Sequence, residues 1–378
     1  MNRWTQLVHF NPNPGDPHCP NTTPIYQTAT FAQSSASEFG QYDYTRSGNP
    51  TRTVLESQIA QLESAQHGFV FASGMAALNA IIGLLDSDDH IIASDDLYGG
   101  TYRMLSKRLV SRQLNYTLVD TSDLKAIKSN LTTRTKLILI ETPSNPTQKI
   151  SDIEAISKLA HQYGIIFVVD NTFLSPWLQQ PLLLGADLVV HSATKHLSGH
   201  SDVTAGSIAT NNDTLAEKIK FIQNADGTAL SPFESWLLIR GIKTLGLRIE
   251  RQQHNAEKIV AYLKNNSKVK QVFYAGLPEH PNFSIHQQQA KGGGSVIGFT
   301  TGCSKLSNHL VEKTKLFTIS VSFGSVSSLI SLPSSMSHAS IQKEAQPFES
   351  NLIRLSIGIE SVDDLIDDLE NAFSTFLI

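Results

Sequence analysis

The sequence predicts a doubly wound α/β domain followed by a smaller α+β domain. From residue 51 onward, helix-like and strand-like segments alternate, which is the order of βαβ units. The segments 165–170 and 187–192 are runs of largely β-branched residues, as in parallel strands covered on both faces. The last third carries several strands with flanking helices, and 378 residues are enough for two domains.

The elements of the first domain follow in order. Residues 1–50 are rich in Pro, Asn, Thr and Ser with little periodicity, which predicts an extended arm. Apolar residues at helical spacing predict a helix over 51–64, and Gly164 is a stop signal for a second amphipathic helix over 152–164. The remaining predicted elements are a helix at 74–85 and strands at 68–73, 90–94, 136–141, 165–170 and 187–192.

The second half has longer helices and shorter connections. Residues 231–266 predict one or two long helices, and 361–376 a final amphipathic helix. Between them lie predicted strands at 270–276, 294–301, 317–323 and 351–360. We therefore expect an arm over 1–50, an α/β domain over 51–235 and an α+β domain over 236–378.

Composition limits the class of protein. The net charge is −4 with no basic block, which argues against a nucleic-acid partner. No apolar run reaches the ~18 residues of a membrane span, and no secretory signal is recognisable. With only Cys19 and Cys303, a disulfide framework is not expected. These features predict a soluble cytoplasmic protein.

Two charged residues follow the ends of predicted parallel strands. Asp170 ends one strand and Lys195 comes shortly after the next, flanked by Ser192 and Thr194. Each alone could be a helix cap or a surface charge. Together they match the needs of pyridoxal 5′-phosphate (PLP), which takes a lysine for covalent binding, a carboxylate for its pyridine nitrogen and hydroxyls with main-chain N–H groups for its phosphate. The "SGMAA" turn at 73–77 predicts such N–H groups.

Eight motifs in the same order extend this match to nearly the whole chain. They are "YDYTRSGNPTR", "FASGMAAL", "DDLYGGTYR", "ETPSNPT", "VVDNTF", "HSATKHLSGHSD", "LSPFESWLLIRGIKTLGLR" and "IRLSIGIE". The chain thus resembles the PLP-dependent enzymes of cysteine and methionine metabolism, the cystathionine synthases and lyases of fold type I. The resemblance implies a PLP-dependent transferase-like fold with a parallel-rich, seven-stranded central sheet.

The resemblance also implies roles for individual residues. Lys195 corresponds to the Schiff-base lysine and proton shuttle, and Tyr98 to the tyrosine that stacks on the cofactor ring. The other cofactor-binding residues would be Gly74, Met75, Asp170, Ser192 and Thr194, and the substrate carboxylate would be bound by Arg354 with Asn145 and Ser322.

Tyr44 and Arg46 correspond to residues that reach the phosphate of a neighbouring subunit. The N-terminal segment would then be an exchange arm, and the expected assembly is a homotetramer built as a dimer of dimers. A metal site is not expected, because the glycine in "LSGH" argues against a helix that would bring His196 and His200 to one face.

The reaction implied is β-cleavage of L-cystathionine to L-homocysteine, pyruvate and ammonia, in methionine biosynthesis. Family members that act at Cγ typically carry a glutamate where this chain has Val321, and methionine γ-lyases a cysteine where it has Gly100. The last third is most similar to the plant-type cystathionine β-lyases, although Asp43 resembles an acidic residue of the γ-enzymes. Three alternatives stay open: a γ-synthase or γ-lyase, an amino-acid racemase side activity, and a PLP-binding regulatory protein.

Overall fold

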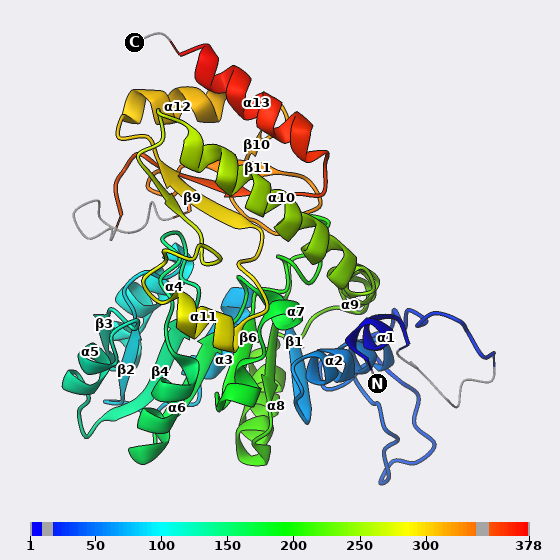
Figure 1. The fold of residues 1–378 in the computed structure, drawn as a ribbon. Helices are drawn as coiled ribbons and strands as arrows, with labels where there is room; N and C mark the ends of the chain where they lie inside the picture. Colours follow the sequence, from blue (N-terminus) through cyan, green and yellow to red (C-terminus); the bar gives the residue numbers. More distant parts are fainter. Residues whose placement is uncertain (1, 10–17, 338–347, 377–378) are drawn as a thin grey trace.

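The chain folds around two sheets, one above the other in Figure 1. The computed structural model describes residues 2–9, 18–337 and 348–376. The larger, seven-stranded sheet has the order β1-β7-β6-β5-β4-β2-β3, and the smaller, five-stranded sheet the order β10-β11-β12-β9-β8. The predicted seven-stranded sheet is thereby confirmed.

The large sheet is rich in parallel pairs. The strand β2 (His90–Ser94) pairs in parallel with β3 (Asn115–Val119) and β4 (Thr135–Glu141), and β4, β5 (Ile166–Asp170) and β6 (Leu188–His191) continue the parallel order. The strand β7 (Gly206–Thr210) runs antiparallel to both neighbours, β6 and β1 (His67–Phe71). The carboxyl ends of β4, β5 and β6 therefore meet at one edge, where α/β folds place their sites.

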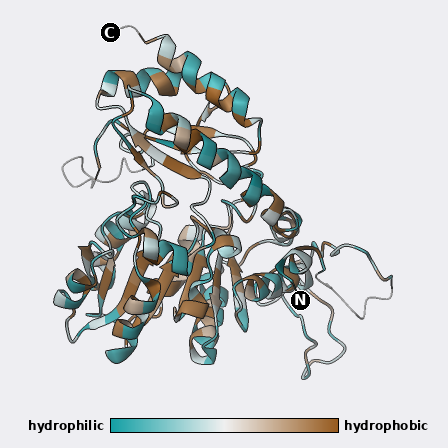
Figure 2. Ribbon diagram, in the orientation of Figure 1, coloured by the Kyte–Doolittle hydropathy of each residue, from teal (hydrophilic) through white to brown (hydrophobic). Residues whose placement is uncertain are grey.

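Apolar side chains explain why these strands lie in the interior. In Figure 2 the strands of the large sheet are mostly brown, and the surrounding helices are teal on much of their surface. Ile138, Ile140, Phe167, Val169 and Val189 are fully buried in one core cluster. Burial at about 25 cal/mol per Å² of apolar surface makes this core the main stabilising contribution to the domain.

Helices surround the large sheet. They are α1 (Arg3–Val8), α2 (Pro50–Leu62), α3 (Gly74–Ile82), α4 (Gly99–Arg103), α5 (Leu124–Ser129), α6 (Ile153–Gln162), α7 (Ser175–Leu178) and α8 (Asp213–Asp226). Several begin at polar caps: Asn49, Ser73, Asp152 and Asn212 each accept a hydrogen bond from a main-chain N–H of the first turn.

Two helices lead to the small sheet. α9 (Pro232–Ile242) and the long α10 (Leu245–Asn265) are separate, so of the one or two helices predicted over 231–266 the structure has two. The sheet consists of β8 (Gln271–Phe273), β9 (Val296–Thr300), β10 (Thr318–Ile319), β11 (Leu329–Ser331) and β12 (Leu352–Ser356). The remaining helices are α11 (Phe283–Gln289), α12 (Ser304–Lys313) and α13 (Val362–Ser374), and Figure 1 shows α10, α12 and α13 outside this sheet.

Three predictions of elements were wrong or incomplete. The arm contains a helix, α1, whose Leu7 is buried and whose Trp4 packs edge-on against Trp177 at 4.7 Å between ring centroids. The predicted strand 317–323 is a strand only at Thr318–Ile319, and residues 321–323 line a cavity. The short strands β3, β7 and β11 were not predicted, and neither were the helices α4, α5, α7, α8, α11 and α12.

Within the described ranges, no helix is long and apolar enough to cross a membrane.

Candidate active site

A cavity of about 460 Å³ opens where the two sheets meet. Its floor is the ends of β4, β5 and β6, and the N-terminus of α3 contributes one wall. Residues 321–323, in the loop after β10, and Arg354 of β12 also line the cavity. Ten of the predicted site residues line it: Gly74, Met75, Tyr98, Asn145, Asp170, Ser192, Thr194, Lys195, Ser322 and Arg354.

Lys195 is half-buried in this cavity. Its Nζ donates a hydrogen bond of 2.6 Å to Ser322 Oγ and lies 5.4 Å from the ring centroid of Phe323. Burial, and next the nearby Arg354 guanidinium, lowers the pKa of the Lys195 ammonium to about 8. A substantial fraction of this amine is therefore neutral near neutral pH, as nucleophilic attack on a carbonyl requires.

Asp170 is oriented by the next turn of the chain. Its Oδ1 accepts hydrogen bonds from Thr172 N at 3.0 Å and Thr172 Oγ1 at 2.5 Å. Burial raises the pKa of Asp170, and these bonds and His191 oppose the shift. The other carboxylate oxygen has no bond to a described residue and suits a protonated pyridine nitrogen.

The start of α3 forms a cradle for an anion. The Ser73 hydroxyl accepts a hydrogen bond from the Ala76 N–H. No described residue accepts a hydrogen bond from Gly74 N or Met75 N. A Cβ built on Gly74 would lie 2.8 Å from Ser192 Cβ, so only glycine permits this approach. The Thr194 hydroxyl is partly used by Ala205, donating to its carbonyl at 3.2 Å and accepting from its N–H at 2.9 Å. The remaining N–H donors at a helix N-terminus fit a phosphate.

Tyr98 stands at the start of α4 and is 41% exposed. Its main-chain N–H donates to Glu141 Oε2 at 3.0 Å. A Cβ on Gly100 would lie 2.4 Å from Tyr98 Cε1, so this glycine makes room for the ring. The tyrosine ring thus lines the cavity, and residue 100 has no side chain that would occupy the space of the ring.

Arg354 is 2% exposed and fixed by two acceptors. Nη1 donates to Asn145 Oδ1 at 3.1 Å and Nη2 to the Ser322 carbonyl at 2.9 Å. Burial lowers the pKa of its guanidinium to about 10, so it stays charged at neutral pH. A planar cation in a cavity is suited to bidentate binding of a carboxylate.

Tyr44 and Arg46 lie outside this cavity. Arg46 Nη1 donates to the Asn224 carbonyl at 2.8 Å, and its guanidinium lies 5.5 Å from the Tyr44 ring centroid. Both residues line a separate hollow beside α9. The chain therefore does not bring these two predicted residues to its own site.

Sequence reasoning missed several other residues of the cavity wall, of which Glu141, Arg103, Phe323 and Met336 are four. Glu141 ends β4 beside Asp170, Arg103 ends α4, and Phe323 and Met336 are apolar. Glu141 was detectable, because it ends a predicted strand two residues before a proline-rich loop. Among the histidines considered for a metal, His196 is buried between the Thr172 carbonyl and Ser295 Oγ, and the described residues hold no cluster suited to a metal ion. His338 lies outside the described residues.

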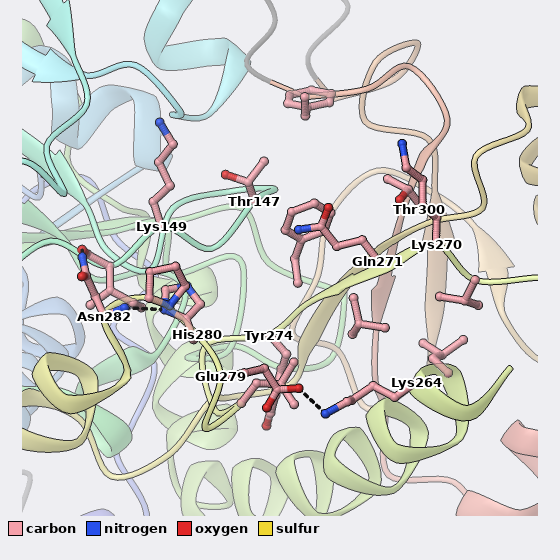
Figure 3. A pocket seen from close by; sticks show the side chains of 18 of the residues that line it. Thr147, Lys149, Lys264, Lys270, Gln271, Tyr274, Glu279, His280, Asn282 and Thr300 are labelled. Carbon is pink, nitrogen blue, oxygen red and sulfur yellow. Dashed lines mark hydrogen bonds and ion pairs between the residues drawn. The ribbon is translucent and has the colours of Figure 1, made fainter. Parts of the chain in front are cut away.

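A second cavity, of about 970 Å³, lies along the edge strand β8 (Figure 3). Its cations are neutralised by neighbours: Lys149 by Asp95 and Asp120, Lys264 by Glu279, and Lys270 by Glu349. His280 Nε2 binds the Gln148 carbonyl at 3.0 Å. The reactive amine and the buried arginine both belong to the smaller cavity, which is the better candidate for an active site.

Comparison with known proteins identifies the family of this chain. Residues 4–374 match the family described as Cys/Met metabolism PLP-dependent enzyme. The chain is 52% identical over 375 residues to cystathionine beta-lyase, chloroplastic, of Arabidopsis thaliana, covering 98% of this chain and 81% of that protein. It is 46% identical over 375 residues to mimosinase, chloroplastic, of Mimosa pudica, covering 98% and 84%. The crystal structure of cystathionine gamma-lyase from Lactobacillus plantarum complexed with L-serine superimposes with a TM-score of 0.97 at 43% identity, covering 99% of both chains.

Proposed function

The chain belongs to the Cys/Met metabolism PLP-dependent enzymes, and from this premise we propose that it cleaves L-cystathionine with water to L-homocysteine, pyruvate and ammonia. The observation that supports β-cleavage is that Val321 lines the cavity at the position directly before Ser322. An apolar side chain there offers no carboxylate to take part in proton transfer at Cβ. Two relatives that are named cystathionine beta-lyase, each 52% identical to this chain, support the same reaction.

The cavity residues fit the cofactor that the family uses. We propose that Lys195 binds PLP covalently, Asp170 pairs with its pyridine nitrogen and Tyr98 packs on its ring. Gly74 N, Met75 N, Ser192 and Thr194 would hold the phosphate. When bound, PLP supplies an electron sink for negative charge at the substrate Cα.

The protein's own groups then bind the substrate and move protons. Arg354, oriented by Asn145 and Ser322, would bind the α-carboxylate in two hydrogen bonds. The Lys195 amine, held at Ser322 Oγ, would take the Cα proton and later return a proton, while the Cβ–S bond breaks and sulfur leaves as the homocysteine thiol. The cationic Arg103 lines the same cavity and suits the distal carboxylate of cystathionine.

The assembly and location are part of the proposal. Because Tyr44 and Arg46 lie away from their own cavity, we expect Tyr44 and Arg46 of the partner subunit to complete the phosphate site, in a homotetramer formed as a dimer of dimers. Sedimentation equilibrium would measure the number of chains. A cytoplasmic location and the domain limits 1–50, 51–235 and 236–378 stay predictions; the named plant relatives are chloroplastic.

The proposed reaction has a direct test. PLP-loaded protein is incubated with L-cystathionine, and the 2-oxo acid and thiol are identified by mass spectrometry. We expect pyruvate with homocysteine. Oxobutyrate with cysteine would refute β-cleavage and favour a γ-lyase. Neither product would redirect the assignment to racemisation, which chiral analysis of incubated alanine would reveal, or to regulation.

The lowered pKa of Lys195 predicts how PLP capture depends on pH. Only the neutral amine attacks an aldehyde, and its fraction rises about tenfold per pH unit below the pKa and levels off above it. With a pKa of about 8, the rate of PLP uptake by the apoprotein should rise up to about pH 8 and then flatten. Stopped-flow absorbance measures this rate. A rise that continues to pH 10 would show that Lys195 behaves as an ordinary exposed lysine.

A further inference from the structure

A second carboxyl group stands beside Asp170. Glu141 is the last residue of β4 and is paired in register with Asp170, the last residue of β5. Side chains at paired positions of neighbouring strands point to the same face. Both carboxyl groups line the cavity, and Glu141 is assigned no role by the proposed reaction.

The two carboxyl groups have unequal numbers of hydrogen-bond donors. Asp170 accepts two hydrogen bonds from Thr172, whereas Glu141 Oε2 accepts one, from the Tyr98 N–H. When two enclosed carboxyl groups lie side by side, ionising both costs more free energy than ionising either one alone. The proton is then retained by the group that accepts fewer hydrogen bonds. The proton of the pair therefore belongs on Glu141.

The other charged groups around Glu141 shift its pKa in opposite directions. Asp96, after β2, and Asp170, on β5, disfavour a further negative charge, and Arg354, on β12, favours it. Burial is the largest effect, and with the two aspartates it raises the pKa of Glu141 well above its usual range. Burial and the two aspartates outweigh the hydrogen bond from the Tyr98 N–H and the arginine, both of which lower this pKa.

We propose that Glu141 is a positioning residue that works as a neutral carboxylic acid, holding the Tyr98 main chain in place while Asp170 keeps the only negative charge of the pair. This arrangement would direct one anion to the pyridine nitrogen and fix the tyrosine that packs on the ring. The inference rests on PLP binding in this cavity and not on the choice between β- and γ-cleavage.

The test compares Glu141→Gln with Glu141→Ala in the holoenzyme, and Glu154→Gln on the exposed face of α6 is the matched control. Two readouts are independent of lyase activity: the pH midpoint of the visible absorption band of bound PLP, and the dissociation constant of PLP. Glutamine is neutral, similar in shape and still accepts from the Tyr98 N–H. We expect its midpoint to lie within a few tenths of a pH unit of the wild type.

Alanine removes the acceptor, and we expect the PLP dissociation constant to rise about tenfold, which corresponds to one lost hydrogen bond of about 1.4 kcal/mol. If Glu141 were ionised, glutamine would remove a negative charge beside the cofactor and lower the midpoint by about one pH unit, which would overturn the neutral state. PLP affinity unchanged in Glu141→Ala would overturn the positioning role. Because neither readout uses cystathionine, an error in the proposed substrate would not produce either result.

Discussion

Replacing Lys195 with alanine is expected to lower the rate of pyruvate formation from L-cystathionine by about 10⁴-fold. The amine has two tasks in the proposed reaction, covalent binding of PLP and proton transfer at Cα. Proton transfer by a positioned group contributes about 10²–10⁴-fold, and loss of the covalent link adds to this. The Ser322 hydroxyl, 2.6 Å from Nζ in the wild type, cannot replace a neutral amine.

The measurement couples pyruvate formation to lactate dehydrogenase, and borohydride treatment followed by mass spectrometry locates any lysine that carries PLP. Lys158→Ala is the control, because Lys158 is exposed and pairs with Glu154 on α6. Reduced PLP on another lysine, with activity kept in Lys195→Ala, would refute the assignment. Equal thermal unfolding of both apoproteins would exclude misfolding as the cause.

The sequence was sufficient to predict two of the charged site residues near the ends of parallel strands, although it missed a third, Glu141. Asp170 and Lys195 were detectable because long β-branched runs mark the strands and topology brings their carboxyl ends together. Arg354 was detectable only through its motif, since nothing in "NLIRLSIGIE" indicates that β12 faces the large sheet. Its burial and its bond to Asn145, 209 residues away in sequence, are consequences of tertiary packing.

The missed features share a physical cause, which is that tertiary contacts determine them. β7 is a five-residue strand that begins with a glycine, and it is stabilised by antiparallel pairing to β1 and β6, which local propensity does not reveal. The helix α1 depends on Trp4 against Trp177. The proposed role of Glu141 likewise depends on its register with Asp170, which sequence spacing alone does not define.

Replacing Arg354 with lysine should lower kcat/KM for L-cystathionine by about 10²-fold, mainly through KM. Lysine keeps the positive charge but presents a single rotatable ammonium, which cannot bind Asn145 Oδ1, the Ser322 carbonyl and a substrate carboxylate in the same planar arrangement. Losing one hydrogen bond to a charged group costs about 1.5–3 kcal/mol, which is about 10–10²-fold in binding. Steady-state kinetics at saturating PLP give both constants.

A matched control separates substrate binding from general damage. Arg251→Lys removes an exposed guanidinium whose bond goes to the Glu360 carbonyl, and it should leave both constants unchanged. Unchanged PLP affinity in Arg354→Lys would show that the loss arises at the substrate and not at the cofactor. Wild-type kcat/KM in that variant would mean that another group, such as Arg103, which lines the same cavity, binds the α-carboxylate. Burial, and next the Arg354 guanidinium, lowers the pKa of Lys195 to about 8, so the same variant tests whether a lysine ammonium at position 354 keeps that pKa near 8.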